Sequence, residues 1–375
     1  MTSLSVRLKS PAELSDLDWA RMTEWRNASG IYDDPMFAPE LIRLVANLRE
    51  DVRLLIIESK DGPVGYWPIL LRPGGWGRPV LGPFSDLHGP ILAPDFVDVV
   101  RAEDVLKASP LSGTTFPAIP LDLSRQSSAD TPGSAIADYS QGWETYISEQ
   151  TAEHPKHFKK MRRLERKIDR EVEQAQFTLN DESDEAFDWL IQTKRSQYEA
   201  TGKHDVLQAQ WASEFLSSLR GFETPRLKVR LSTLSFDGTL VASELNMWSD
   251  KVLHGWITAI NPDYRSFSPG YLLMQWVMEQ SATEGIETSD LGPGQLDYKK
   301  YYTNAFIALS SLTGKKEGKV RPLGDLWSGF EKLAPSRMAH QMGRMRRRSD
   351  QICASEPDFG ARLKGHANAL LKSRP

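Results

Sequence analysis

The fold is decided by the stretch Arg265-Ser266-Phe267-Ser268-Pro269-Gly270-Tyr271-Leu272-Leu273. An apolar run over 252–259 predicts a strand before it, and apolar residues at helical spacing predict a helix after it. Ser268 suits the helix cap, Pro269 suits the first helical position, and Gly270 lets a ligand approach the backbone closely. A strand, a glycine-bearing turn and a helix in this order aim free backbone N–H groups at a phosphate. A well-capped core helix with no ligand accounts for the pattern equally well.

A strand–turn–strand signal occurs twice upstream of this stretch. In each case Asp-Gly separates two apolar runs, which is typical of a β-hairpin. The turns are Asp61-Gly62 and Asp237-Gly238, which lie 176 residues apart. Helical patterns precede both hairpins, over 12–25 and 39–48 in the first case and over 185–200 and 208–219 in the second. The recurrence indicates two copies of one α/β unit, although Asp-Gly hairpins are common enough to recur by chance.

The composition is that of a folded globular protein. The chain has 375 residues, 40% of them hydrophobic and 26% charged, and this length favours two domains over one. No apolar run approaches the roughly 20 residues that span a bilayer, and the first ten residues lack the apolar core of an export signal. The single cysteine, Cys353, excludes an internal disulfide framework and a cysteine-cluster metal site. We therefore expect a cytoplasmic protein.

Further motifs extend the pattern on both sides. The stretch Asp290-Leu291-Gly292-Pro293-Gly294 follows the predicted helix, and Tyr298-Lys299 comes soon after it. The first half contains 61-DGPVG-65, 68-PIL-70 and 85-SDLHGP-90. Together with the stretch at 265–273, these motifs resemble the CelD/BcsL family of bacterial polysaccharide-biosynthesis proteins, which have a GNAT-type acyltransferase domain and are related to the FemAB aminoacyltransferases. The resemblance covers roughly residues 12–313.

The resemblance implies an α/β protein with two tandem GNAT-like domains. Each domain would be a mixed, mostly antiparallel sheet flanked by helices. Residues 1–123 would form a degenerate, catalytically silent domain, and 141–313 the acyltransferase domain. The segment 124–140 is rich in Ser, Ala and Asp and is predicted to be a linker, and 314–375 a basic helical extension.

An acyl-CoA would then be the co-substrate, with its pyrophosphate at the start of the helix after residue 268. The residues implied at this position are Arg265, Ser266, Ser268, Gly270, Tyr271 and Leu272. The usual acetyltransferase phosphate loop is shortened here to Ser-Pro-Gly, and proline removes one N–H donor. Acetyl-CoA, another acyl-CoA and aminoacyl-tRNA therefore all stay open as donors. No metal is expected, because His, Asp and Glu nowhere cluster at ligand spacing.

Acyl transfer needs a group that takes the nucleophile's proton and a donor for the developing oxyanion. His254, on the strand before the stretch, and Glu244, on its predicted neighbour, are the candidate bases, although a lone strand histidine is more often structural. The resemblance places Tyr298 near the cleft as a proton donor to the leaving thiolate. Asp290 could orient a sugar hydroxyl or amine, or simply cap the next turn. The candidates for binding the substrate are Asp86, His88 and Lys299.

Positive charge gathers in two places. Residues 156–170 carry 8 Lys and Arg against 2 Asp and Glu. Residues 314–375 carry 14 against 6, a net charge of +8, so the remainder of the chain carries −12. A helix predicted over 335–350 brings Arg344, Arg347 and Arg348 together for an anion, which could be cyclic di-GMP, a lipid-linked diphosphate or the inner-membrane surface. The first of these is suggested by the resemblance alone. A solvated helix face explains either basic block equally simply.

The sequence therefore predicts an acetyl-CoA-dependent N-acyltransferase that modifies an amino sugar, activated or lipid-linked, of an exopolysaccharide or holdfast precursor. Two alternatives stay open. A FemAB-like aminoacyltransferase would use charged tRNA and contact it through 156–170. A non-catalytic scaffold of a polysaccharide synthase would keep the fold and sense a nucleotide.

Overall fold

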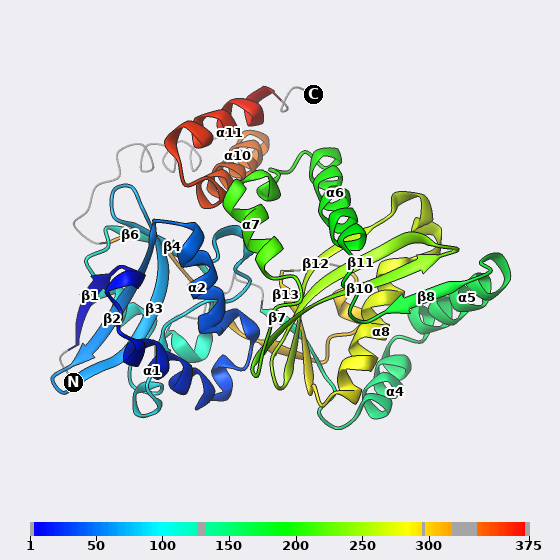
Figure 1. Ribbon diagram of the computed structural model, residues 1–375, viewed down its shortest axis with the longest axis horizontal. Helices are drawn as coiled ribbons and strands as arrows, with labels where there is room; N and C mark the ends of the chain where they lie inside the picture. Colours follow the sequence, from blue (N-terminus) through cyan, green and yellow to red (C-terminus); the bar gives the residue numbers. More distant parts are fainter. Residues whose placement is uncertain (1–3, 126–132, 295–296, 317–335, 372–375) are drawn as a thin grey trace.

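The computed structural model describes residues 4–125, 133–294, 297–316 and 336–371. These residues form two sheets side by side, each with its own helices, and a helical pair that packs at one end (Figure 1). Within the described part of the chain, no helix is both long and apolar enough to cross a bilayer.

The first sheet has seven strands, in the order β1-β2-β3-β4-β6-β15 with β5 beside β3. The strands are β1 (Ser5–Lys9), β2 (Val52–Ser59), β3 (Gly62–Arg72), β4 (Trp76–Pro79), β5 (Ile91–Leu92), β6 (Gly113–Pro120) and β15 (Leu309–Lys315). Its helices are α1 (Asp16–Asn27), α2 (Pro39–Leu48) and α3 (Ala102–Ala108). The predicted hairpin at Asp61-Gly62 is confirmed, since β2 and β3 pair antiparallel around it.

The second sheet has eight strands, in the order β14-β7-β13-β12-β11-β10-β8 with β9 beside β10. They are β7 (Ser134–Asp138), β8 (Ala175–Thr178), β9 (Glu223–Thr224), β10 (Leu227–Phe236), β11 (Thr239–Trp248), β12 (Val252–Ile260), β13 (Thr288–Pro293) and β14 (Ala305–Ile307). The helices are α4 (Trp143–Glu153), α5 (Pro155–Glu171), α6 (Asp184–Ala200), α7 (Gln210–Ser218) and α8 (Pro269–Thr283). The second predicted hairpin is confirmed, with Asp237 and Gly238 both at positive φ in its turn.

Each sheet contains a parallel pair of strands. In the first sheet β4 pairs with β6, and in the second β12 pairs with β13. Both pairs are short: the first runs from Trp76↔Gly113 to Gly77↔Thr114, and the second from Val252↔Thr288 to His254↔Asp290. Beyond that point β12 continues to Ile260 and leads into α8 through a 3₁₀ turn, η8 (Pro262–Phe267). The two strands therefore part directly after His254 and Asp290.

The two domains share one hydrophobic core. Phe84 of the first domain packs against Trp211 of α7 and Trp256 of β12. Buried residues of α6, α7 and the facing side of the second sheet belong to the same apolar cluster as the first domain's core. A second cluster fills the opposite face of that sheet under α4, α5 and α8. The first cluster therefore packs the two domains against each other, and the second belongs to the second domain alone.

The C-terminal helices α10 (Ser336–Ser355) and α11 (Phe359–Leu371) pack onto both domains. Arg78 of the first domain pairs with Asp350, and Arg49 donates to the carbonyl of Ala354. Trp211 of the second domain donates its indole N–H to the carbonyl of Ser355. The helix predicted over 335–350 is thus present, and it is part of the folded body.

Two sequence predictions about segment boundaries are wrong. Residues 134–138, predicted to lie in a linker over 124–140, form β7, a buried strand between β13 and β14. Residues 309–313, predicted to close the second domain, belong to β15, which pairs with β6 of the first sheet. Both errors have one cause: a strand's partner is chosen by long-range register, and short runs such as Ser134–Asp138 carry little periodicity of their own.

Candidate functional site

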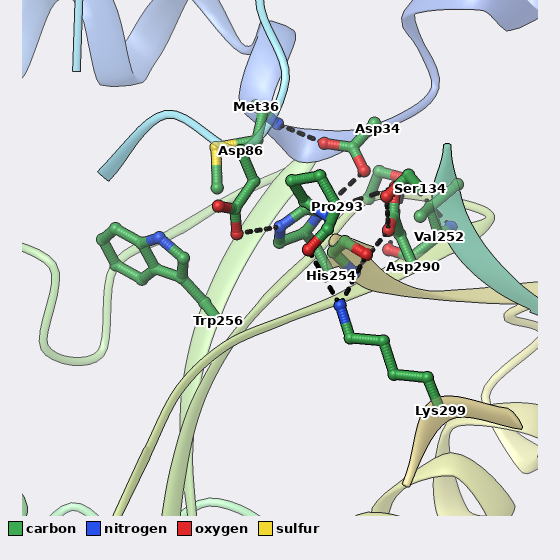
Figure 2. Close-up of polar contacts among 12 residues, drawn as sticks. Asp34, Met36, Asp86, Ser134, Val252, His254, Trp256, Asp290, Pro293 and Lys299 are labelled. Carbon is green, nitrogen blue, oxygen red and sulfur yellow. Dashed lines mark hydrogen bonds and ion pairs between the residues drawn. The ribbon is translucent and has the colours of Figure 1, made fainter. Parts of the chain in front are cut away.

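The site is a cluster of charged side chains at the junction of the two domains (Figure 2). His254 of β12 lies between carboxylates that come from three different segments. Asp34 comes from the loop before α2, Asp86 from the loop after β4, and Asp290 from β13. The first two belong to the first domain, so neither domain alone builds the cluster.

His254 is fully buried and both of its ring nitrogens face carboxylates. Nδ1 lies 2.8 Å from Asp34 Oδ2, and Nε2 lies 3.2 Å from Asp86 Oδ2. Burial by itself lowers the pKa of His254, but the charges of Asp34, Asp86 and Asp290 outweigh it and hold the pKa well above its ordinary value. In this environment His254 is an imidazolium that joins the two domains, and it is poorly suited to take a proton.

Asp290 is the most buried of the three carboxylates. Its Oδ1 accepts the Ser134 hydroxyl at 2.5 Å and the Gly292 N–H at 2.7 Å. Its Oδ2 has no hydrogen-bond partner among the described residues and lies 4.0 Å from His254 Nδ1. Burial raises the pKa of Asp290 to about 6, although the charge of His254 opposes this.

Lys299 closes the side of the cluster next to β13. Its Nζ donates to the carbonyls of Gly292 at 2.7 Å and Pro293 at 3.0 Å. Gly292 can place its N–H on Asp290 and its carbonyl on Lys299 because it adopts φ 85°, a conformation that favours glycine. Burial lowers the pKa of Lys299, with Asp86 and Asp290 acting in the opposite direction. Lys299 thus holds the last residues of β13 from inside the protein.

Glu244 lies on the other face of the second sheet from His254. Met247 pairs with His254 across β11 and β12, and Glu244 is three residues before Met247, so the two side chains point to opposite faces. Glu244 is buried, and its Oε2 has no partner among the described residues. Burial raises its pKa to about 7. Of the two bases predicted from sequence, Glu244 is therefore the one that can exchange a proton near neutral pH.

Glu244 lies beside the point where β12 and β13 part. A Cβ at Gly255 would lie 3.4 Å from Glu244 Oε1 and 3.6 Å from the Asp290 carbonyl. The register between β11 and β12 shifts here, from Leu245↔Ile257 to Asn246↔Gly255, so Trp256 is an extra residue in β12. A bulge of this kind leaves the extra residue out of the hydrogen-bond ladder. The bulge thus puts backbone polar groups next to a buried carboxylate.

The start of α8 differs from the prediction. Ser268 adopts a left-handed conformation with φ 52°, and its side chain makes no capping hydrogen bond. The N–H groups of Tyr271 and Leu272 both point at the Ser268 carbonyl, at 3.1 and 3.4 Å. A Cβ on Gly270 would lie 2.6 Å from Ile260, so this glycine is required by close packing against β12. The turn offers fewer amides to a phosphate than the sequence implies.

The other residues predicted for cofactor binding fall into two groups. Arg265 and Ser266 are exposed in η8, where they can reach a ligand. Leu272 is a buried core residue, so its side chain cannot reach a ligand.

Tyr271 is half-buried and meets Tyr298 edge to face, with the ring centres 6.1 Å apart. Tyr298 is itself largely buried, and burial, with Glu244 and Asp86 nearby, raises its pKa. Tyr298 therefore keeps its proton and can donate it.

His88 is wrongly predicted as a substrate-binding partner of Asp86. Its ring packs between Trp67 and Phe116 in the first domain, and both nitrogens are without a partner among the described residues. Burial lowers its pKa to about 3.

The predicted nucleotide-binding arginines stay untested. The side chains of Arg344 and Arg347 lie outside the described residues, and Arg348 is half-buried.

Two members of the site were not predicted. Asp34 precedes a proline in a loop, where an aspartate usually caps a turn, and here too its Oδ1 accepts the Met36 N–H. Ser134 lies in the segment predicted to be a linker. No local pattern marks either residue, because each meets His254 or Asp290 only through contacts more than 150 residues apart in sequence.

Comparison with known proteins identifies the second domain. Residues 155–300 match the model of the acetyltransferase (GNAT) domain. Structures similar to the whole chain include FemX, with 10% identity over 82% of this chain and 95% of FemX, at a TM-score of 0.50. A conserved protein of unknown function from Bacteroides thetaiotaomicron VPI-5482 has 11% identity over 82% of this chain and 100% of its own, also at 0.50. A search of curated proteins found no match.

These likenesses establish the fold. The chain contains a GNAT acetyltransferase domain, and its two sheets flanked by helices match tandem GNAT-like domains, as predicted. At 10–11% identity the similar structures carry no information on the substrate.

Proposed function

We propose that the protein is an acyltransferase that moves an acyl group from an acyl-CoA to an amine or hydroxyl of an acceptor. The observation that carries the proposal is Glu244. It is a buried carboxylate whose pKa burial raises to about 7, and its Oε2 has no hydrogen-bond partner within the described part of the chain. It lies next to the point where the parallel strands of the GNAT domain part. A bound acyl-CoA would supply a thioester carbonyl that is already activated toward a nucleophile.

The residues around the parting strands fit such a co-substrate. β12 carries Gly255, which lies beside Glu244, and the bulge at Trp256, and it then leads through η8 to the start of α8. Arg265 is exposed there, and Lys167 of α5 lies over the ring of Phe267 at 3.9 Å, so two positive charges flank the turn. Because Pro269 has no N–H and Tyr271 N–H is engaged, these side chains would hold a diphosphate more than the amides do.

Two proton transfers follow from the site. Glu244 can take the proton of an amine or hydroxyl acceptor, since its pKa of about 7 leaves a substantial carboxylate fraction at neutral pH. Tyr298, whose pKa is raised by burial and by the charges of Glu244 and Asp86, stays protonated and can hydrogen-bond a departing thiolate, as the proton donor that the resemblance implies. His254, Asp34, Asp86 and Asp290 fix the two domains around this centre.

An amino sugar of an exopolysaccharide precursor is the acceptor that the sequence resemblance suggests, and we keep it as the finer proposal. Asp86 supports it, because its carboxylate is partly exposed at the domain junction and can accept hydrogen bonds from an amine or hydroxyl.

The test is calorimetry with acetyl-CoA followed by a thiol-release assay. We expect acetyl-CoA to bind the wild type, and Arg265→Glu to weaken binding at least about 10-fold because a repulsive charge replaces an attractive one at the diphosphate. Lys60→Glu is the matched control: Lys60 is exposed in the β2–β3 turn of the first domain, and binding should be unchanged. Glu244→Gln should keep binding and lower turnover by about 10²–10⁴-fold.

Absence of acetyl-CoA binding by the wild type would contradict the proposal. Equal turnover of Glu244→Gln and wild type, with acetyl-CoA still bound, would assign the proton transfer to another group. Gly270→Glu is a poorer probe than the sequence suggests, because a side chain there must displace Ile260.

A FemAB-like use of aminoacyl-tRNA is the second candidate, and α5 favours it. Its buried stripe is Phe158, Met161, Leu164 and Ile168, whereas Lys156, Lys159, Lys160, Arg162, Arg163, Arg166 and Arg170 are exposed. This basic face lies beside η8 and the start of α8, since Lys167 contacts Phe267 and His157 contacts Tyr271. Binding of tRNA that falls steeply with salt, and no binding of acetyl-CoA, would select this alternative.

A further inference from the structure

The geometry points to a binding site for one divalent transition-metal ion of the Zn²⁺ class, with Asp34, His254 and Asp290 as its ligands. Within the described residues these three offer one ligand atom each, and the atoms all lie within 4.8 Å of one another. Asp34 Oδ2 is 2.8 Å and Asp290 Oδ2 is 4.0 Å from His254 Nδ1. Zinc bonds of about 2.0–2.2 Å separate neighbouring ligand atoms by roughly 3–4 Å, so Asp34 would move back from His254, and the two carboxylate oxygens, which lie within 4.8 Å of each other, would adjust around the ion.

Each of the three side chains has a second polar atom that points away from the proposed ion, and each of these atoms is already hydrogen-bonded. Asp34 Oδ1 accepts the Met36 N–H at 2.8 Å, and Asp290 Oδ1 accepts Ser134 and the Gly292 N–H. His254 Nε2 lies 3.2 Å from Asp86 (Figure 2). Metal-binding histidines usually donate their second N–H to a carboxylate, and metal-binding carboxylates are themselves hydrogen-bonded, so this outer shell is the one a metal centre needs. The remaining atoms, Asp34 Oδ2, His254 Nδ1 and Asp290 Oδ2, face one another.

Asp290 Oδ2 is a separate observation in favour of the site. The side chain is completely buried, yet this oxygen has no hydrogen-bond partner among the described residues. A buried carboxylate oxygen without a partner costs free energy, and protein interiors rarely leave one. An ion between Asp290 Oδ2, His254 Nδ1 and Asp34 Oδ2 would satisfy it.

The balance of charge also favours a cation. Three carboxylates, those of Asp34, Asp86 and Asp290, face a single imidazole, while the ammonium of Lys299 is directed at two backbone carbonyls. The buried guanidinium of Arg26 also lies near Asp34, but it donates to the carbonyl of Asp33. A divalent ion would offset the excess negative charge, and the ring nitrogen that now faces Asp34 would lose its proton to bind it. Since its ligands come from both domains, the ion would also fix them relative to each other.

The donor set selects the kind of ion. One imidazole nitrogen and two carboxylate oxygens suit Zn²⁺ and similar ions, whereas Ca²⁺ requires six to eight oxygens and Mg²⁺ keeps several waters. We therefore expect Zn²⁺ to bind, and Ca²⁺ and Mg²⁺ to fail at the same concentration.

The experiment uses the full-length, tag-free chain stripped with EDTA. Zn²⁺ is titrated by calorimetry, and bound zinc is counted by elemental mass spectrometry after gel filtration. We expect about one zinc per chain, a thermal midpoint raised by about 2–4 °C or more, and at least about 10-fold weaker binding in Asp290→Asn and in Asp34→Asn. Neither readout needs activity, so the result is independent of the proposed function.

The matched control is His204→Gln, which removes another buried histidine that lies 3.9 Å from Glu356. It should leave the zinc stoichiometry unchanged, and loss of zinc in this variant would place the ion elsewhere and overturn the assignment. Absence of zinc from the wild type, or unchanged binding in both aspartate variants, would overturn it as well. Circular dichroism of the metal-free proteins shows whether each variant is folded, and Asp34→Asn decides the question if Asp290→Asn is not.

Discussion

The two domains place very different side chains around the same structural feature. Each sheet has one parallel pair whose strands are joined through a helix, β4 and β6 through α3, and β12 and β13 through α8. In the first domain the space beside the pair is filled: Gly113 packs against the ring of Trp76, and Gly77 packs against Leu111 and Phe116. In the second domain the strands part beside Glu244 and Asp290. The architecture is shared, and the side chains beside the parallel pair differ between the two copies.

One buried histidine from each domain repeats this contrast. His88 of the first domain lies between Trp67 and Phe116, and burial lowers its pKa to about 3. His254 of the second domain is buried to the same degree, and its carboxylate neighbours raise its pKa well above the ordinary value. Burial alone therefore does not make a histidine functional; the charge of its neighbours determines whether it is a core residue or part of a site.

The largest expected difference is in stability after each histidine is replaced by leucine. In the metal-free protein, His254→Leu leaves Asp34 and Asp290 buried without their cation, and we expect a loss of about 3–5 kcal/mol in the free energy of unfolding. His88→Leu replaces an unpaired ring by an apolar side chain among aromatics, so we expect a change within about 1 kcal/mol. Urea unfolding measures both. Equal losses in the two variants would show that the histidines share one environment.

A smaller difference is expected when a methyl group is added beside each parallel pair. A Cβ on Gly113 would lie 2.1 Å from the Trp76 ring, so Gly113→Ala should cost about 1–3 kcal/mol through overpacking. A Cβ on Gly255 would meet Glu244 only at 3.4 Å, an ordinary contact, and Gly255→Ala should cost less than about 1 kcal/mol while weakening acetyl-CoA binding. Thermal unfolding and calorimetry test the pair. A smaller loss of stability in Gly113→Ala than in Gly255→Ala would mean that the space beside β4 and β6 is not filled.

The sequence predicted what local patterns encode. The Asp-Gly hairpins and the helix over 39–48 are present because turn chemistry and apolar spacing act within a few residues. The sequence prediction includes His254, Glu244 and Asp290 because they lie on predicted strands next to the stretch 265–273. Asp34 could not be found in this way, since it meets His254 only after the domains pack. The pairing of β7 in the second sheet, where a linker was expected, and of β15 in the first sheet escaped detection for the same reason.

A third effect separates the two histidines by the pH dependence of stability. His88 has a folded pKa of about 3 against an ordinary value near 6.5, so its contribution to stability is present above pH 6.5 and is lost as the pH falls toward 3. His254 has a raised folded pKa, so its contribution is complete below pH 6.5 and is lost only as the pH rises through that raised value. Between pH 6.5 and 4.5 the wild type should lose roughly 1.4 kcal/mol per pH unit relative to His88→Leu, because the groups common to both proteins cancel. Urea unfolding of the two proteins across this range measures the difference. Parallel pH profiles would mean that His88 accepts a proton in the folded state, and the contrast between the two domains would then lose its electrostatic basis.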